Sequence, residues 1–331
     1  MSKEQWGLFR CPTCRGPLQF QLRPWSDREK PGTVQDGPSG QADCRPCGAF
    51  YVIRKGIPRF VGDSGYTASF GMQWNLHRRA QLDSHTGLPI SRTRLFSVTG
   101  WPSDLSGLSI LEAGSGAGRF TEVLLASGAQ VYSFDYSEAV EANFANNGHH
   151  PELTLFQGDI FRIPFESASF DKVISLGVLQ HTPDPERAFR SLSEMVRPGG
   201  ELVIDVYAKT LAARLQWKYV LRPLTRRMDT GTLYRLVSRW TPRMIPMARW
   251  LRAIGGRVGA KLVPIVEYSH LGLSPQLNRE WAILDTFDMY SPAHDYPQSV
   301  ASVKRWFDGA GFAKISVRRG PNGVVGKGTK V

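Results

Sequence analysis

The stretch Ser109-Ile110-Leu111-Glu112-Ala113-Gly114-Ser115-Gly116-Ala117-Gly118-Arg119-Phe120 decides the fold of this 331-residue chain. A short apolar run ends in an acid, three glycines follow on alternate positions, and residues that can start a helix come next. This order predicts a strand, a tight turn and a helix N-terminus whose backbone N–H groups lie open to a ligand. Many nucleotide-binding folds use such a turn, so its meaning depends on the residues around it.

Strand and helix patterns alternate with short gaps after this turn. Predicted strands cover 108–113, 130–135, 153–157, 170–176 and 201–207, and predicted helices cover 119–127, 137–146 and 186–196. This alternation is typical of a doubly wound, Rossmann-like α/β sheet, in which ligands bind at the carboxyl ends of the strands. The residues at those ends are therefore the candidates for cofactor binding.

Three acids fall at the ends of successive strands. Glu112 closes the first strand, Asp135 closes the second, and Asp159 follows the third. A carboxylate at Asp135, 19 residues after Gly116, can accept hydrogen bonds from both ribose hydroxyls. Asp159 can accept from an adenine amine while Ile160 packs on the ring. Since no cluster of Lys or Arg lies nearby in the sequence, the pattern favours a nucleoside without phosphates.

Together these motifs resemble those of class I S-adenosylmethionine-dependent methyltransferases. The resemblance rests on Glu-x-Gly-x-Gly-x-Gly at 112–118, Asp135, Gly158-Asp159-Ile160 and Phe170-Asp171-Lys172-Val173-Ile174-Ser175. Leu179-Gln180-His181 and Arg197-Pro198-Gly199-Gly200 extend it to the ubiquinone-biosynthesis-like branch, methyltransferase type 11. A dehydrogenase is the competing interpretation, but the alternate glycines ending at Gly118 and the Asp159 motif favour the methyltransferase.

The resemblance implies a seven-stranded sheet and S-adenosylmethionine as the cofactor. It implies that Gly114 and Gly116 lie against the methionine part, Asp135 on the ribose and Asp159 at the adenine. The full set of cofactor-binding residues that we expect is Glu112, Gly114, Gly116, Gly118, Asp135, Tyr136, Asp159, Ile160 and Leu176.

All four cysteines lie near the N-terminus in two Cys-x-x-Cys pairs, Cys11 with Cys14 and Cys44 with Cys47. Four thiolates arranged in two such pairs are the tetrahedral ligand set that zinc prefers. We therefore predict a structural zinc site and a reducing compartment. With Gly56-Ile57-Pro58, the unit resembles the zinc ribbon of the small tRNA-methyltransferase activator proteins. Residues 24–43, rich in Pro, Gly, Asp and Ser, are predicted to form a loop.

One segment carries the whole net charge of +12. Residues 209–262 contain thirteen Lys or Arg and a single acid, Asp229, so the remainder of the chain is neutral. Helical spacing there predicts amphipathic helices with a basic face. The apolar stripes and their basic neighbours are Leu211, Leu215 and Tyr219 with Arg214, Lys218 and Arg222; Leu233, Leu236, Val237 and Trp240 with Arg235, Arg239 and Arg243; and Trp250, Leu251 and Ile254 with Arg249, Arg252 and Arg257.

Three interpretations of these helices stay open. They form a lid over the substrate cleft, and their basic face meets anionic lipid, an RNA backbone or only solvent. Their aromatic residues fall at helical core spacing rather than as a platform on which bases stack, which counts against RNA.

A hydroxyl acceptor of the methyl group benefits from a general base, and His181 follows the fourth predicted strand, where family members meet their substrate. A turn cap is the other interpretation of His181, and His294 and Asp295 are alternative bases on a Pro-rich loop. No Asn-Pro-Pro-Tyr sequence is present, which counts against amino methylation. We expect O-methylation of a sugar, a lipid-linked glycan or a natural-product-type small molecule. The alternatives are an rRNA or tRNA methyltransferase and a catalytically inactive scaffold.

We expect five regions in this chain. They are a zinc ribbon at 1–62, a linker and helical cap at 63–107, the methyltransferase core at 108–207, the basic insertion at 208–290 and a C-terminal helix and strands at 291–331. The N-terminus has no secretory leader and no apolar run reaches the length of a bilayer span, so we expect a cytoplasmic protein. Peripheral contact with the inner face of the membrane through 209–262 is an additional expectation.

Overall fold

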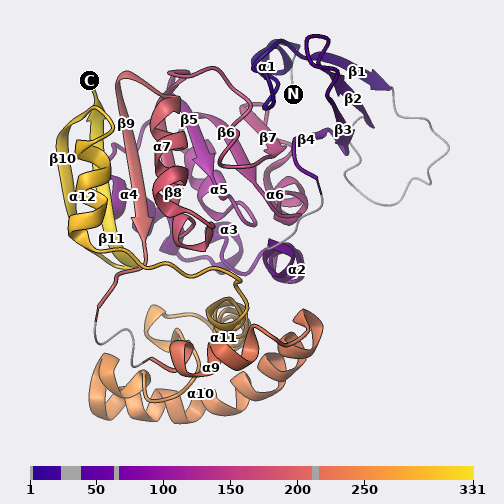
Figure 1. Cartoon of the computed structure of the whole chain (residues 1–331). Helices are drawn as coiled ribbons and strands as arrows, with labels where there is room; N and C mark the ends of the chain where they lie inside the picture. The colour runs from indigo at the N-terminus through magenta and orange to yellow at the C-terminus, as the bar shows by residue number, and fades with distance from the viewer. Residues whose placement is uncertain (1–2, 24–38, 63–66, 211–215) are drawn as a thin grey trace.

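This computed structural model describes residues 3–23, 39–62, 67–210 and 216–331. A single β-sheet runs through this part of the chain (Figure 1). Its 11 strands follow the order β1-β2-β3-β4-β7-β6-β5-β8-β9-β11-β10. The strands are β1 Gln19–Arg23, β2 Ser39–Asp43, β3 Phe50–Arg54, β4 Ile57–Arg59, β5 Ser109–Ala113, β6 Gln130–Asp135, β7 Leu153–Gln157, β8 Phe170–Leu176, β9 Val196–Val206, β10 Phe312–Gly320 and β11 Gly323–Lys330.

Seven of these strands, from β7 to β10 in the sheet order, confirm the predicted Rossmann-like α/β core. Strands β7, β6, β5, β8 and β9 are parallel, whereas β11 is antiparallel to β9, and the edge strand β10 is antiparallel to β11. Three predicted strands match their observed bounds, and only the strand expected at 201–207 begins earlier. It begins earlier because Val196 already pairs with Phe170 before a register shift.

Helices cover both faces of this core. On one face lie α4 Ile90–Thr99, α5 Arg119–Ala126 and α6 Ala139–Asn147, and on the other lie α7 Pro185–Met195 and α12 Val300–Asp308. The sequence explains α7 well, since Asp184 caps it by accepting from the Arg187 N–H and Pro185 stands in its first turn. Its apolar stripe, which includes Phe189 and Leu192, is buried in the core.

The N-terminal region extends the sheet. Its strands β1 to β4 and the short helix α1 Lys3–Gly7 join the core where β4 pairs in parallel with β7, at Arg59 and Gln157. The Phe9 ring packs against Phe60, Phe156 and Phe165, with ring centroids 5.2, 5.4 and 4.9 Å away. The ribbon and the core therefore share one hydrophobic cluster.

Part of the loop predicted at 24–43 is instead strand β2. Residues 39–43 pair with β1 on one side and β3 on the other, and these two ladders outweigh the weak strand propensity of Ser-Gly-Gln-Ala-Asp. Residues 24–38 lie outside the described part of the chain.

The insertion forms a helical layer across the carboxyl ends of the parallel strands, drawn in orange at the bottom of Figure 1. It contains α9 Trp217–Thr225, α10 Thr230–Ala260, the short η3 Ser269–Leu271 and α11 Pro275–Tyr290. The remaining helices are α2 Ala68–Leu76, which contacts both α6 and α11, α3 Asp83–Thr86, which contacts α4, and η2 Leu179–His181, which contacts α7. Across the described ranges, every helix is too short or too polar to cross a bilayer.

The prediction that α9 has a basic outer face is wrong. Lys218 and Arg222 are only 6% and 8% exposed, because the Lys218 Nζ pairs with Asp295 at 2.8 Å and the Arg222 Nη2 donates to the Pro292 carbonyl at 2.6 Å. The apolar Val220 and Leu224 face outward instead. Leu211, Arg214 and Leu215, which the same stripe included, lie outside the described residues.

Candidate active site

A cavity of about 1300 Å³ lies between the carboxyl ends of the central strands and the helical insertion. Its walls include Gly114 to Ala117 after β5, Asp135 after β6, and Leu176 and His181 after β8, with Asp285 and Asp288 of α11 opposite. Strand order reverses between β5 and β8, where α/β sheets bind their ligands. The volume exceeds the roughly 300–1000 Å³ of a pocket for one small molecule, so a donor and an acceptor fit together.

The glycine turn is held in a conformation that excludes side chains. Gly114 and Gly116 have φ of 80° and 52°. A Cβ at Gly114 would lie 2.3 Å from a Val178 methyl, and one at Gly116 would lie 3.1 Å from the Trp74 ring. Trp74 and Phe70 of α2 also line the cavity, so the aromatic cluster of this helix covers the turn.

Asp135 holds the turn in place. One carboxylate oxygen accepts from the Gly116 N–H at 2.9 Å, and the other accepts from the Ser137 N–H at 2.9 Å and hydroxyl at 2.7 Å. Burial raises the pKa of Asp135 in spite of these bonds. The oxygen that accepts from the Gly116 N–H keeps acceptor capacity for a further donor, as the predicted ribose contact requires.

Glu112 and Gly118 lie beneath the turn and do not line the cavity. One Glu112 oxygen accepts from the hydroxyls of Thr121 and Ser133, and burial raises its pKa to about 7. A Cβ at Gly118 would lie 2.2 Å from the Asn143 side-chain oxygen. The structure thus gives both residues a packing role under the predicted cofactor seat.

The remaining predicted cofactor residues divide between two cavities. Tyr136, Ile160 and Leu176 line the main cavity. Asp159 does not; its side chain accepts from the Phe161 N–H at 2.9 Å and lines a second cavity of about 840 Å³ beside the ribbon, which Tyr136 also borders. Whether Asp159 meets adenine stays a prediction.

Two arginines that were not predicted from the sequence, Arg94 and Arg119, line the main cavity. The sequence shows no cluster of Lys or Arg near the three acids at the strand ends. Arg119 reaches Gln81 through its Nη1, and Arg94 of α4 pairs with the buried Asp205 at 3.2 Å. Among the described residues nothing accepts from the buried Arg94 Nε. Arg119 directly follows the glycine turn, so its position was visible in the sequence, whereas Arg94 arrives only through the fold.

His181 stands in the wall of the cavity with its two ring nitrogens in different surroundings. The Nδ1 lies 3.0 Å from the His294 carbonyl, an acceptor, so this nitrogen carries the proton. The buried Nε2 has no hydrogen-bond partner within the described ranges. Burial lowers the pKa of His181, and the nearby Asp288 and Asp295 carboxylates offset part of this effect. A neutral imidazole with a lone pair on Nε2 results.

A row of acids and phenols faces the glycine turn across the cavity, three of them from the insertion and Tyr207 from the end of β9, and it was not predicted from the sequence. Tyr268 donates to Asp285, and the Tyr207 hydroxyl lies 3.5 Å from Asp288. Burial and the neighbouring Asp288 raise the pKa of Asp285 to about 6. The spacing of Asp285 and Asp288 places both on one face of a helix, which was the available signal. Asp295, an alternative base, is instead paired with Lys218.

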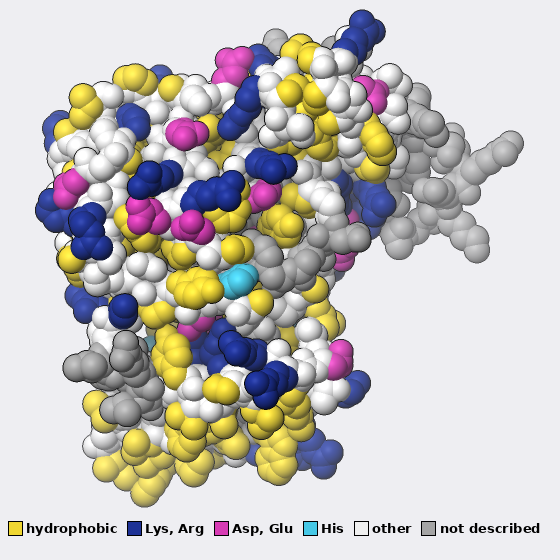
Figure 2. Space-filling model, in the orientation of Figure 1, with side chains coloured by type: hydrophobic (Ala, Val, Ile, Leu, Met, Phe, Trp, Pro, Cys, Tyr) yellow, Lys and Arg dark blue, Asp and Glu magenta, His cyan; other side chains and the backbone are white. Residues whose placement is uncertain are grey.

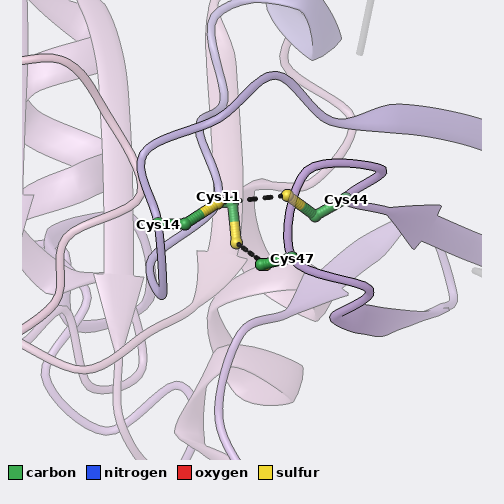
Figure 3. A group of neighbouring side chains, drawn as sticks. All are labelled: Cys11, Cys14, Cys44 and Cys47. Atoms are coloured by element: carbon green, nitrogen blue, oxygen red, sulfur yellow. Dashed lines mark hydrogen bonds between the residues drawn. The ribbon is translucent and has the colours of Figure 1, made fainter.

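The four cysteines come together as predicted (Figure 3). Their sulfurs lie within 4.8 Å of one another, with Cys11 and Cys47 at 3.7 Å and Cys14 and Cys44 at 3.3 Å. Zinc–sulfur bonds of about 2.3 Å place tetrahedral sulfurs roughly 3.8 Å apart, so the cluster fits a zinc ion. Each knuckle closes on a bond from a backbone N–H, of Arg15 or of Gly48, to the carbonyl of its first cysteine.

The core also matches a family model. Residues 111–204 match the model described as a methyltransferase domain. With the glycine turn, Asp135 and the seven-stranded core, this match shows that the chain contains a class I S-adenosylmethionine-dependent methyltransferase domain. The cavity fits the cofactor, since its backbone turn excludes any Cβ and its walls carry both acceptors and arginines.

Similar proteins carry several activities. A tRNA U34 carboxymethyltransferase from Idiomarina loihiensis is 28% identical over 185 residues, 54% of this chain and 53% of that one. A ubiquinone biosynthesis O-methyltransferase from Coxiella burnetii is 29% identical over 113 residues, 34% and 48% of the two chains. This chain thus spans about half the length of these relatives. A solved complex of the Haloferax volcanii Trm112 methyltransferase activator with a methyltransferase has a TM-score of 0.46 at 13% identity, covering 78% of this chain and 96% of that one.

Proposed function

We propose that this protein is an S-adenosylmethionine-dependent O-methyltransferase whose acceptor is a hydroxylated sugar, a lipid-linked glycan or a natural-product-type small molecule. The observation that supports this proposal most directly is the hydrogen bonding of the His181 ring. Its Nδ1 is bound to a backbone carbonyl and its Nε2 has no partner in the described structure, in the wall of the cavity that contains the glycine turn.

Few residues hold the methyl donor in this proposal. The turn at Gly114 and Gly116 admits the methionine part, Asp135 accepts from the ribose, and Arg94 and Arg119 attract the methionine carboxylate. When bound, S-adenosylmethionine supplies an electrophilic methyl group on a sulfonium. Because the reaction is an in-line displacement, aligning the acceptor oxygen accounts for most of the rate enhancement.

His181 removes the proton from the acceptor. As the hydroxyl oxygen attacks the methyl carbon, the proton moves from that oxygen to Nε2, while the Nδ1–H stays bonded to the His294 carbonyl. The carboxylates of Asp288 and Asp295 nearby stabilise the resulting imidazolium. The acids and phenols that face the glycine turn suit the hydroxyl groups of a sugar, since they offer both acceptors and donors.

A second candidate function is methylation of rRNA or tRNA. The similarity to a tRNA U34 carboxymethyltransferase and the positive charge of 209–262 favour it. Lys218 and Arg222 of that segment are buried and cannot reach a phosphate backbone, which supports the small-molecule acceptor.

Methyl transfer from labelled S-adenosylmethionine tests both candidates. The protein is incubated separately with a carbohydrate extract, a lipid extract and bulk RNA, with Asp135→Ala as the matched control. Label in the carbohydrate or lipid extract that is stable to mild base, as a methyl ether is, supports the proposal. Label in RNA alone overturns it in favour of the second candidate. No binding of S-adenosylmethionine by calorimetry would indicate an inactive scaffold.

A further inference from the structure

Helix α10 carries an exposed apolar ridge, whose last member lies beyond a kink at Gly256, where φ and ψ are not helical. The ridge consists of Leu236, Trp240, Met247, Trp250, Ile254 and Val258. Trp250, Ile254 and Val258 are 62%, 69% and 75% exposed, although side chains of this size are normally covered. Figure 2 shows hydrophobic side chains gathered along the bottom of the molecule, where Figure 1 draws this helix.

The ridge is not the face by which α10 packs on the protein. Leu233, Val237, Thr241 and Ala248 form the buried face of the helix. Val220 and Leu224 of α9 are exposed as well, 60% and 68%, so the apolar surface continues onto the next helix. Two helices of the insertion thus present apolar side chains away from the core.

Basic residues flank the ridge on α10. Arg235, Arg239, Arg243 and Arg249 are all exposed. The single acid of residues 209–262, Asp229, caps the start of α10 by accepting from the Thr232 N–H at 2.9 Å. An apolar stripe with tryptophans beside uncompensated arginines matches a bilayer surface, where aromatic rings enter the interface and cations meet anionic headgroups.

We propose that the ridge of α10, with Val220 and Leu224, docks this protein on an anionic membrane surface. A second copy of the chain is a poorer occupant, because pairing two ridges would bring two arginine rows together without acids between them. RNA is a poorer occupant as well, because most of the side chains of this surface are apolar and a phosphate backbone gains little by covering them.

The docking surface lies beside the cavity. Trp217 and Lys261 are exposed, yet both also line the cavity that reaches the glycine turn. The Trp217 indole N–H donates to the Leu262 carbonyl at 3.0 Å, which ties the start of α9 to the end of α10. If the proposed function holds, this arrangement also specifies the acceptor. The acceptor is then an amphiphile whose polar head enters the cavity from the membrane.

Vesicle sedimentation without any methyl donor tests the docking surface. Phosphatidylcholine vesicles with phosphatidylglycerol are compared with phosphatidylcholine alone, using the full chain. We expect binding to the anionic vesicles only, weakened about fivefold for each of Arg239→Ser and Arg243→Ser. The double variant Trp240→Gln and Trp250→Gln should bind at least about tenfold more weakly. Phe50→Gln is the matched control, because Phe50 is equally exposed but lies in the ribbon.

Three results would overturn the proposal. The first is wild-type binding that does not distinguish the two vesicles. The second is unchanged binding by the tryptophan double variant. The third is self-association or RNA binding that the double variant loses while vesicle binding is absent. Asp135→Ala, which removes the predicted ribose contact, should sediment with anionic vesicles like the wild type. Failure of docking is therefore distinguishable from failure of the proposed methyl transfer.

Discussion

Glu112 lies beneath the glycine turn in a site that favours its protonated form. One oxygen accepts from Thr121 and Ser133, and the other has no hydrogen-bond partner among the described residues. Burial raises its pKa from 4.5 to about 7. Because the folded state binds this proton more tightly, the stability from Glu112 is complete below pH 4.5 and is lost as the pH rises through about 7.

Replacing Glu112 by Gln should therefore stabilise the folded state more at high pH than at low pH. We expect the stability of Glu112→Gln relative to the wild type to increase by on the order of 3 kcal/mol between about pH 4.5 and pH 8. Urea denaturation at both pH values measures this difference, and other titrating groups cancel in it. A difference that does not change with pH would contradict the raised pKa.

His181→Asn tests the base assigned to the reaction. The asparagine amide can keep the bond to the His294 carbonyl but has no counterpart of Nε2. We expect kcat to fall about 10²- to 10⁴-fold with little change in affinity for S-adenosylmethionine. Because burial lowers the pKa of His181 below 6.5, the wild-type rate should fall only at pH values below that, where the imidazole gains its second proton. An unchanged kcat would remove His181 from the mechanism.

At the level of elements, α9 is oriented by a buried ion pair. The Lys218 Nζ lies 2.8 Å from an Asp295 oxygen, and their side chains are 8% and 2% exposed. Replacing Lys218 by Met leaves the Asp295 charge uncompensated, so we expect a loss of about 3–5 kcal/mol in the free energy of unfolding. The double variant Lys218→Met and Asp295→Asn should recover most of this loss in a denaturant titration. Equal loss in both variants would show that the pair does not orient α9.

The zinc ribbon should be coupled to the core through Phe9. Arg15 donates to the carbonyls of Ile163 and Phe165 at 2.8 Å, and the Phe9 ring packs on Phe165. Removing zinc with a chelator should release the two cysteine knuckles and lower the melting temperature by roughly 10 °C. Calorimetry with and without the chelator measures the shift, with metal analysis as the control. A melting temperature that stays constant after the metal is lost would contradict the coupling.

At the scale of the whole molecule, the cavity joins the sheet to the insertion. Gly116 and Asp285 face it from opposite sides, so S-adenosylmethionine should protect both elements from hydrogen exchange. At a cofactor concentration of about 100 times Kd, the expected stabilisation is about 2.7 kcal/mol. Asp135→Ala should lose most of it. Protection confined to the turn would separate the insertion from the cofactor site.

The apolar pattern of the sequence predicted most of the strands of the core. Strands at 130–135, 153–157 and 170–176 have the predicted bounds, because continuous apolar runs between turn residues are typical of strands buried on both faces. The four-cysteine cluster followed from its spacing alone. The predictions failed on α9, where helical periodicity located two stripes but could not tell which one faces the protein.

Local chemistry in the sequence determined the methyltransferase core, the glycine turn and the cysteine cluster, since each depends on residues close together in the chain. The partners of His181, Asp285 and Lys218 come from segments up to 113 residues away. Only the tertiary structure determined these partners. The distant His294 carbonyl decides that the Nε2 of His181 is left without a partner among the described residues, and the distant Asp295 carboxylate allows the charge of Lys218 to be buried. The same holds for α10, whose apolar ridge is exposed because the helix packs on the protein through an adjacent face, which contains Leu233, Val237, Thr241 and Ala248.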